Sequence, residues 1–254
     1  MAHIITIANQ KGGVGKTTTT AALADGLTQK GYKVLQIDLD SQGNLTYTAR
    51  ADASGLTSLE LLHGTATAKE ATQQAAAGDI IAASPNLAGS DKDLTGTGAD
   101  KRLKAALEQI KSEYDFIIID APPSLSILTI NALTAADSVI IAAQADTYSL
   151  QGIGQLYNTI SAIQRHTNKG LKIAGILLTR YNGRAILSRD LTDIAEQTAA
   201  QLKTKVFNAK IREGIAVKEA QASGQSVLTY SPRSNPARDY SDFIEELLAD
   251  LKQR

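Results

Sequence analysis

Residues Ile4–Thr18 read IITIANQKGGVGKTT and decide how the chain begins to fold. The apolar run Ile4–Ala8 is predicted as a β-strand, and the pattern from Thr17 to Gln29 is predicted as a helix. Glycines in the intervening loop let the backbone turn its N–H groups toward an anion without obstruction by a Cβ. A glycine-rich loop between a strand and a helix that opens with Lys-Thr is typical of a phosphate-binding loop.

Short apolar runs alternate with helical patterns along the rest of the chain. The further strands are predicted at Lys33–Ile37, Phe116–Ile119, Ser138–Ala143 and Lys172–Leu178. Helices are predicted near residues 101–112, 126–135, 149–165 and 186–202, with a last one starting at 234–237. Unbroken apolar strands suit a sheet that is covered on both faces. The alternation predicts an α/β fold with a doubly wound, mostly parallel sheet flanked by helices.

No low-complexity linker or internal repeat divides the chain. Residues 1–254 are therefore predicted to form a single domain. Residues 64–102, rich in Ala, Thr, Gly and Asp, show no clear pattern, and a surface excursion over one sheet edge is one interpretation of them.

Composition excludes several classes of protein. The 254 residues contain no cysteine, which rules out disulfides, a cysteine zinc site and a Cys-ligated iron–sulfur cluster. No apolar stretch approaches the roughly 20 residues that span a bilayer. The first residues lack the features of a signal peptide, so a cytoplasmic protein with no membrane partner is expected.

The glycine-rich loop predicts specific contacts with a nucleotide. Its backbone is expected to hold phosphate through Gly12, Gly13, Val14 and Gly15. Lys16 is placed to reach the β- and γ-phosphates, and the Thr17 hydroxyl is placed to ligate Mg²⁺. Thr18 is expected to bond a phosphate further back. ATP and Mg²⁺ are the predicted ligands.

Two of the predicted strands lead into aspartates. Asp38 and Asp40 follow the second strand, and the run Phe116–Asp120 precedes Ala-Pro-Pro. Carboxylates at the C-terminal ends of strands lie where α/β sheets bind ligands. Asp120 is therefore predicted to hold Mg²⁺ through a water. Asp38 is interpreted as a structural residue or as part of the Mg²⁺ shell. For both Asp38 and Asp40, the alternative is that the side chain simply caps a loop.

The loop KGGVGKTT, residues 11–18, resembles the deviant Walker A motif of the ParA/MinD class of P-loop ATPases. The resemblance implies that Lys11 reaches across a dimer interface to the nucleotide of the other subunit, as an arginine finger does. It also implies that Asp40 takes part in water activation and in the metal shell. Lys11, Lys16 and Asp40 are thus the predicted catalytic residues, and Thr17, Asp40 and Asp120 the predicted metal residues. The alternative for Lys11 is a solvated loop lysine.

The resemblance extends to the segments DLDSQGN, IIIDAPPS, VKEAQASGQSV and YSPRSNPARDY, and the last two are similar to the ParA/Soj type of partition ATPase. It implies nucleotide contacts at Pro123, Arg212 and Gly214. Relatives often carry proline where Arg212 stands and asparagine where Gly214 stands. The last helix is rich in Asp and Glu, unlike the basic membrane helix of MinD.

Positive charge gathers in residues 165–238, which hold 13 Lys and Arg against 5 Asp and Glu, although the whole chain has 26 of each. The resemblance implies nonspecific DNA binding there, through contacts with phosphates. A solvated charged face is the alternative. The predicted DNA contacts are Arg184, Arg189, Lys203, Lys205, Lys210, Lys218 and Arg233.

The expected function is an ATP-dependent DNA-partition switch. By resemblance, ATP closes a homodimer on nonspecific DNA at the nucleoid, and a centromere-binding partner of the ParB type stimulates hydrolysis and release. A related ATPase that positions another cargo is one alternative. An ATP-dependent metabolic synthetase of the dethiobiotin or cobyrinate type is another, although His3, His63 and His166 lie in no recognisable motif.

Overall fold

The computed structural model describes residues 1–144, 146–183 and 186–252, with side chains described except at 147–151 and 186–189. The described residues form a seven-stranded sheet in the order β3-β4-β2-β5-β1-β6-β7. Its strands are β1 (His3–Ala8), β2 (Val34–Asp38), β3 (Thr72–Gln73), β4 (Asp79–Ile81), β5 (Phe116–Asp120), β6 (Ser138–Gln144) and β7 (Lys172–Thr179). All neighbours are parallel except β3 and β4. The predicted fold class is confirmed.

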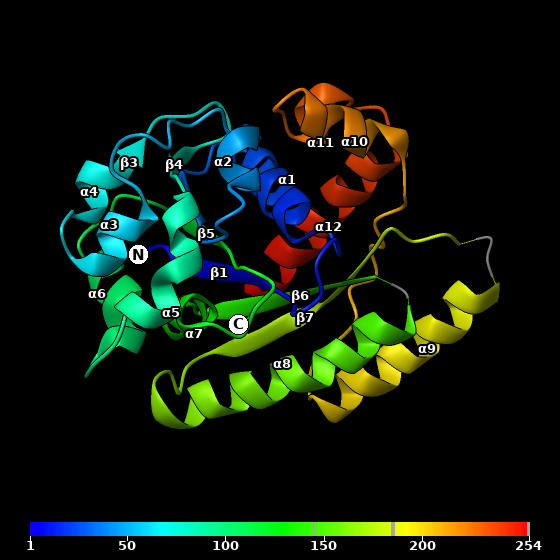
Figure 1. Ribbon diagram of the computed structural model, residues 1–254. Helices are drawn as coiled ribbons and strands as arrows, with labels where there is room; N and C mark the ends of the chain where they lie inside the picture. The colour runs from blue at the N-terminus through cyan, green and yellow to red at the C-terminus, as the bar shows by residue number, and fades with distance from the viewer. Residues whose placement is uncertain (145, 184–185, 253–254) are drawn as a thin grey trace.

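Helices cover both faces of the sheet (Figure 1). One face is covered by α1 (Lys16–Gln29), α10 (Ile215–Ala222), α11 (Val227–Tyr230) and α12 (Asn235–Lys252). The other is covered by α3 (Ser58–His63), α4 (Ala68–Ala71), η1 (Pro85–Gly89), α6 (Arg102–Glu108), α7 (Ile127–Ala135), α8 (Thr147–His166) and α9 (Ile186–Gln201). The short α5 (Ser90–Asp93) and η2 (Ala99–Lys101) pack against α7. The short α2 (Asn44–Thr48) packs beside α1.

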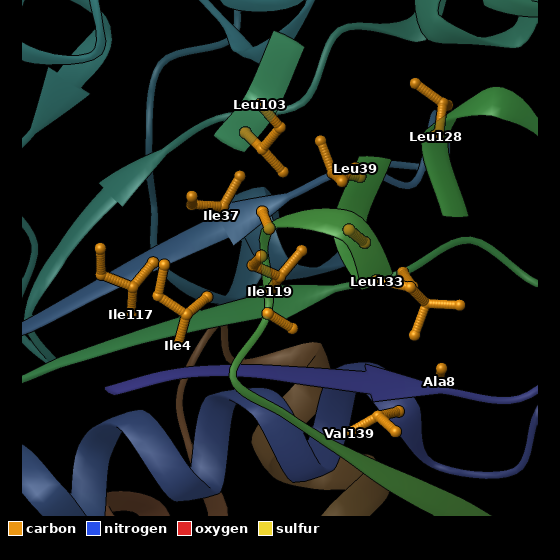
Figure 2. Packing of buried hydrophobic residues seen from close by; sticks show 14 of the residues in the cluster. Ile4, Ala8, Ile37, Leu39, Leu103, Ile117, Ile119, Leu128, Leu133 and Val139 are labelled. Atoms are coloured by element: carbon orange, nitrogen blue, oxygen red, sulfur yellow. The ribbon is translucent and has the colours of Figure 1, made fainter. Parts of the chain in front are cut away.

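Alternation along the strands divides the core into two layers. In β1, Ile4 and Ala8 belong to one hydrophobic cluster, whereas Ile5 and Ile7 belong to the other. Figure 2 shows the first cluster, in which Ile4 lies among side chains of neighbouring strands and of the helices on that face. Because both faces are buried, an unbroken apolar strand is the stable pattern.

The segment 64–102 does cover a sheet edge, and it does so partly with strands of its own. β4 pairs in parallel with β2, and β3 pairs antiparallel with β4. β3 has two residues and β4 has three, which is too short to show a period, so the sequence alone does not predict either strand. None of the described helices is long and apolar enough to cross a membrane.

Beyond β7, the segment 204–212 runs parallel to the strand and closes that edge. Val206 bridges to Ile176, and Phe207 packs so near Gly175 that a Cβ there would lie 2.6 Å from the Phe207 ring. Phe207 in turn meets Phe243 of α12 edge to face, with ring centroids 4.9 Å apart. The absence of a side chain at Gly175 therefore fixes how this segment docks.

Exchanging glycine for alanine at two positions tests this packing. Gly175→Ala should lower the free energy of unfolding by about 1–3 kcal/mol, because the buried ring must move. Gly154→Ala in α8, where a Cβ meets no atom within 4 Å, should raise it by about 0.5–1 kcal/mol. Urea unfolding measures both changes, and equal effects at the two positions would contradict the packing.

Candidate nucleotide-binding site

The loop after β1 takes the shape that its glycines permit. Gly13 and Gly15 have φ angles of 74° and 83°, a region that favours glycine. A Cβ at Gly12 or Gly13 would meet no atom within 4 Å, so the concave side of the loop is open. Val14 is buried, and its carbonyl accepts a hydrogen bond of 2.7 Å from the Thr179 hydroxyl at the end of β7. The loop is thus held at Val14 by the core and by Thr179, and it is open beside Gly12 and Gly13.

Lys16 opens α1 and points its ammonium group back over the loop. Its Nζ donates to the Lys11 carbonyl at 3.2 Å, and the side chain is buried. Burial lowers the pKa of Lys16, while Asp120 and Asp40 oppose that shift. A buried cation at the start of a helix, beside open N–H groups, creates a strongly anion-attracting position.

Both carboxylate oxygens of Asp38 are occupied by hydrogen bonds within the protein. It ends β2 in register with Asp120 of β5. One carboxylate oxygen accepts from the Asp40 N–H at 3.0 Å, and the other accepts from both the N–H and the hydroxyl of Thr46 at 2.8 Å. Burial raises the pKa of Asp38, against the effect of the Thr46 hydrogen bonds. Of the two interpretations of Asp38, the structure favours the structural one.

Asp120 is the opposite case. Its Oδ1 accepts a hydrogen bond of 3.4 Å from the Thr20 hydroxyl, and its Oδ2 is buried without a hydrogen-bond partner among the described residues. Burial and the neighbouring Asp38 raise the pKa of Asp120, while the Thr17 hydroxyl and the Lys16 ammonium lower it. A buried carboxylate oxygen left unpaired carries a free-energy cost that a bound cation would remove.

The donor set around Asp120 fits Mg²⁺. This ion takes oxygen ligands and usually combines one or two carboxylates with waters and substrate phosphates. Asp120, Asp40 and the Thr17 hydroxyl supply such oxygens beside the phosphate loop. No cluster of three or more His, Cys, Asp or Glu able to hold a metal occurs in the described part of the chain.

A cavity of about 730 Å³ lies over the loop, a size that suits a small-molecule site. The predicted site residues that line it are Gly12, Gly13, Gly15, Lys16, Thr17, Thr18, Asp40, Pro123, Arg212, Gly214 and Lys218. Val14 does not line it, because its side chain belongs to the core. Lining residues that the sequence did not reveal include Tyr47, Thr179 and Gln221. Only Thr179 had a usable signal, since it ends an apolar strand.

Lys11 does not line the cavity, and its side chain pairs within its own chain. Its Nζ lies 2.6 Å from Asp146 Oδ2, and both side chains are partly exposed. The reach across a dimer interface that the resemblance implies would require Lys11 to leave Asp146. A partly exposed ion pair of this kind contributes little stability, so exchanging one partner for another costs little.

Arg212 and Gly214 have structural reasons to depart from the family pattern. Arg212 donates to both oxygens of Asp239, with its closest contact at 2.6 Å. A Cβ at Gly214 would lie 2.8 Å from the Pro236 ring. Arginine and glycine therefore dock the segment before α10 onto the start of α12, which shapes one wall of the cavity.

The predicted DNA contacts do not form one patch. Lys203 lies near the amino end of β7, since the adjoining Thr204 hydroxyl donates to the Ile173 carbonyl at 3.0 Å. Lys205 pairs with Glu246 at 2.6 Å and Asp250 at 2.7 Å, which anchors α12. Lys218 is exposed and lines the cavity, Lys210 lies over the Tyr181 ring and next to the lining residue Ile211, and Arg233 is exposed between α11 and α12. Arg184 and the side chain of Arg189 lie outside the described residues.

A strand, a glycine loop and a helix, with an aspartate at the end of a neighbouring parallel strand, define a nucleotide site of the P-loop type. The family model described as an AAA domain matches residues 2–173. The sporulation initiation inhibitor protein Soj of Bacillus subtilis is 39% identical over 98% of this chain and 100% of its own length. The chromosome partitioning protein ParA of Myxococcus xanthus is 34% identical over 97% of this chain and 88% of its own.

Among solved structures, cobyrinic acid a,c-diamide synthase from Mycobacterium smegmatis, with a bound ATP analog and magnesium, is 35% identical. It superposes with a TM-score of 0.86 and covers 99% of this chain and 96% of its own. The chain belongs to the ParA/Soj family of partitioning ATPases. The predictions of this family and of an ATPase are therefore confirmed.

The two buried aspartates should respond differently to neutralisation. Asp38→Asn should lower the free energy of unfolding by about 1–3 kcal/mol, because an amide cannot accept all three hydrogen bonds. Asp120→Asn should leave it unchanged or raise it, because burial raises the pKa of Asp120 and so disfavours the ionised carboxylate in the folded state. Urea unfolding at neutral pH without nucleotide measures both. Similar losses for the two variants would contradict the distinction.

Proposed function

We propose that the chain is an ATP-driven DNA-partition switch in which one cavity binds Mg-ATP and its nucleotide state controls dimerisation. The observation that carries this proposal is the combination of an open phosphate loop, the buried Lys16 ammonium and the unpaired Asp120 oxygen at one edge of the sheet. The loop supplies N–H donors for the phosphates, the Lys16 ammonium supplies positive charge beside them, and the Asp120 carboxylate supplies an oxygen that can accept from the hydration shell of a magnesium ion.

Each site residue has a proposed role. The backbone N–H groups of residues 12–15 and the Lys16 ammonium bind the phosphates, and Thr17 and Asp120 hold the metal, with Asp40 beside them. Bound Mg²⁺ would neutralise negative charge on the phosphates. Asp40 orients the attacking water from the segment that Asp38 fixes. Pro123, Arg212 and Gly214 contribute to the walls of the site.

Lys11 is proposed to act in trans. When two copies meet face to face at the cavity, the Lys11 side chain exchanges Asp146 for the phosphates of the partner's nucleotide. A triphosphate offers more negative charge than one carboxylate, so ATP favours the exchange. In this scheme the dimer forms only with ATP and separates after hydrolysis.

Nonspecific DNA is the proposed surface to which the dimer binds. Lys218 is exposed and lines the cavity, and Lys210 precedes the lining residue Ile211, so a dimer joined at the cavity would bring two copies of these lysines together. Arg233, exposed between α11 and α12, is a further proposed contact. Lys203 and the ion-paired Lys205 lie elsewhere, which makes them weaker candidates for DNA contacts.

A partner of the ParB type is proposed to stimulate hydrolysis, and a cytoplasmic, nucleoid-associated location follows from DNA binding. We also propose that residues 1–254 form a single domain.

A metabolic synthetase is the second candidate, because one similar solved structure is named a cobyrinic acid a,c-diamide synthase. Such an enzyme needs a second substrate beside the nucleotide and has no need of DNA. A positioning ATPase for another cargo would share every step except the partner. ATP turnover that depends on a small organic acid and ignores DNA would favour the synthetase.

Three variants test the proposal by nucleotide binding and by light scattering after gel filtration. Lys16→Ala should weaken ATP binding by about 10- to 100-fold, since a charge-assisted contact is lost. Lys11→Ala should bind ATP but remain a monomer. Asp40→Ala should bind ATP, dimerise and stay dimeric, because hydrolysis fails.

Lys92→Ala, at an exposed position of α5 that does not line the cavity, is the control and should behave as the wild type. Normal ATP hydrolysis by Asp40→Ala would show that its role is assigned wrongly. ATP-dependent dimers of Lys11→Ala would contradict its action in trans.

A further inference from the structure

Two side chains fasten the segment after Asp40 to the far wall of the cavity. The Tyr47 hydroxyl of α2 donates to the Ala222 carbonyl at 3.1 Å. The Arg50 guanidinium donates to the carbonyls of Ser223 at 3.0 Å and Gly224 at 3.3 Å. We call these two side chains and the carbonyls of residues 222–224 the α2–α10 latch. It joins parts of the chain that are more than 170 residues apart.

The chemistry of the α2–α10 latch suits the end of a helix. The last carbonyls of a helix have no partner within it and carry partial negative charge. Arg50 brings a cation with several donors to that end of α10, and Tyr47 adds a neutral donor. The latch therefore satisfies acceptors that would otherwise rely on water.

The backbone on both sides is shaped for close approach. Arg50 has φ 55°, which is uncommon for a residue other than glycine. Gly224 has φ 57°, and a Cβ there would lie 3.3 Å from the Tyr47 carbonyl. A strained turn at an arginine persists when the surrounding contacts hold it in place. The hydrogen bonds of Arg50 are such contacts.

The α2–α10 latch spans one wall of the cavity. Tyr47 lines the cavity and follows Thr46, through which Asp38 holds this segment. On the other side α10 also lines the cavity, and its Gln221 donates to the Thr18 hydroxyl at 2.9 Å. Figure 1 shows α2, α10 and α11 on the side of the sheet that α1 covers. Opening the latch would separate α10 from the segment that carries Asp40.

We propose that Tyr47 and Arg50 are positioning residues that hold α10 against the Asp40 segment and so retain the bound nucleotide. The inference rests on the proposed nucleotide site and adds the element that controls release from it. Neither residue needs to touch the phosphates. Their effect passes through α10, whose movement would widen the cavity and speed the loss of ADP.

Release of a fluorescent ADP, the N-methylanthraniloyl derivative, from the full chain tests the proposal in a stopped-flow experiment. Tyr47→Phe and Arg50→Met each remove donors but keep most of the side chain. Each should speed release by about threefold, and the double variant by about tenfold. Arg50→Lys retains a cation at the helix end and should restore most of the wild-type rate.

Matched controls come from outside the latch. Arg165→Met removes an exposed arginine whose Nε donates to the Ser161 carbonyl of its own helix, and Tyr157→Phe removes a hydroxyl from the same helix. Both should release the fluorescent ADP at the wild-type rate. Thermal unfolding without nucleotide separates a structural effect from a positioning one.

The outcomes are distinguishable. If the wild type binds no fluorescent ADP, the proposed nucleotide site itself fails. If the wild type binds it and the double variant releases it at the wild-type rate, the latch is overturned. A lower melting temperature with unchanged release would likewise assign Tyr47 and Arg50 to stability alone.

Discussion

At the carboxyl edge of the sheet, β5 ends in Asp120, a buried carboxylate whose charge is disfavoured by burial and whose Oδ2 has no hydrogen-bond partner among the described residues. The protein holds this group in place because parallel pairing puts the ends of β1, β2 and β5 side by side. The same pairing brings the phosphate loop and Lys16 beside it. A bound magnesium nucleotide would place positive charge near the Asp120 carboxylate and negative charge near the Lys16 ammonium. Nucleotide binding should therefore stabilise the folded protein.

Around this edge the structure separates residues that support from residues that act. The polar atoms of three supporting residues hydrogen-bond to other parts of the protein. Asp38 and Thr46 bond to each other and fix the segment that carries Asp40, and Thr179 bonds to the phosphate loop and fixes it. By contrast, Asp120 keeps one oxygen without a hydrogen-bond partner among the described residues, and the buried Lys16 ammonium has one hydrogen bond, to the Lys11 carbonyl. Lys11 combines both properties: it is paired with Asp146 in this structure, but a partly exposed ion pair is weak enough for Lys11 to exchange it for another partner. The α2–α10 latch also supports the fold, and in our proposal it holds together the wall of the cavity that opens when nucleotide leaves.

The parts of the molecule that the sequence predicts are those with strong local signals. The five longer strands and the phosphate loop follow from apolar runs and glycine spacing, and the structure confirms the fold that they imply. β3, β4 and α2 are too short for any period to show. The pairings Arg212–Asp239 and Lys205–Glu246 join residues that are 27 and 41 positions apart, and no local pattern predicts them. For this reason the basic residues, which read as one group in the sequence, lie in different places in the fold.

Binding of the wild-type protein to nonspecific duplex DNA, with ATP, with ADP and without nucleotide across a salt series, tests the central claim most directly. A nucleotide-controlled switch should retard the DNA only with ATP. Its affinity should fall steeply as salt rises, because lysine and arginine contacts with phosphates release counterions. Failure to retard DNA with ATP at low salt, or equal binding in all three states, would contradict the account.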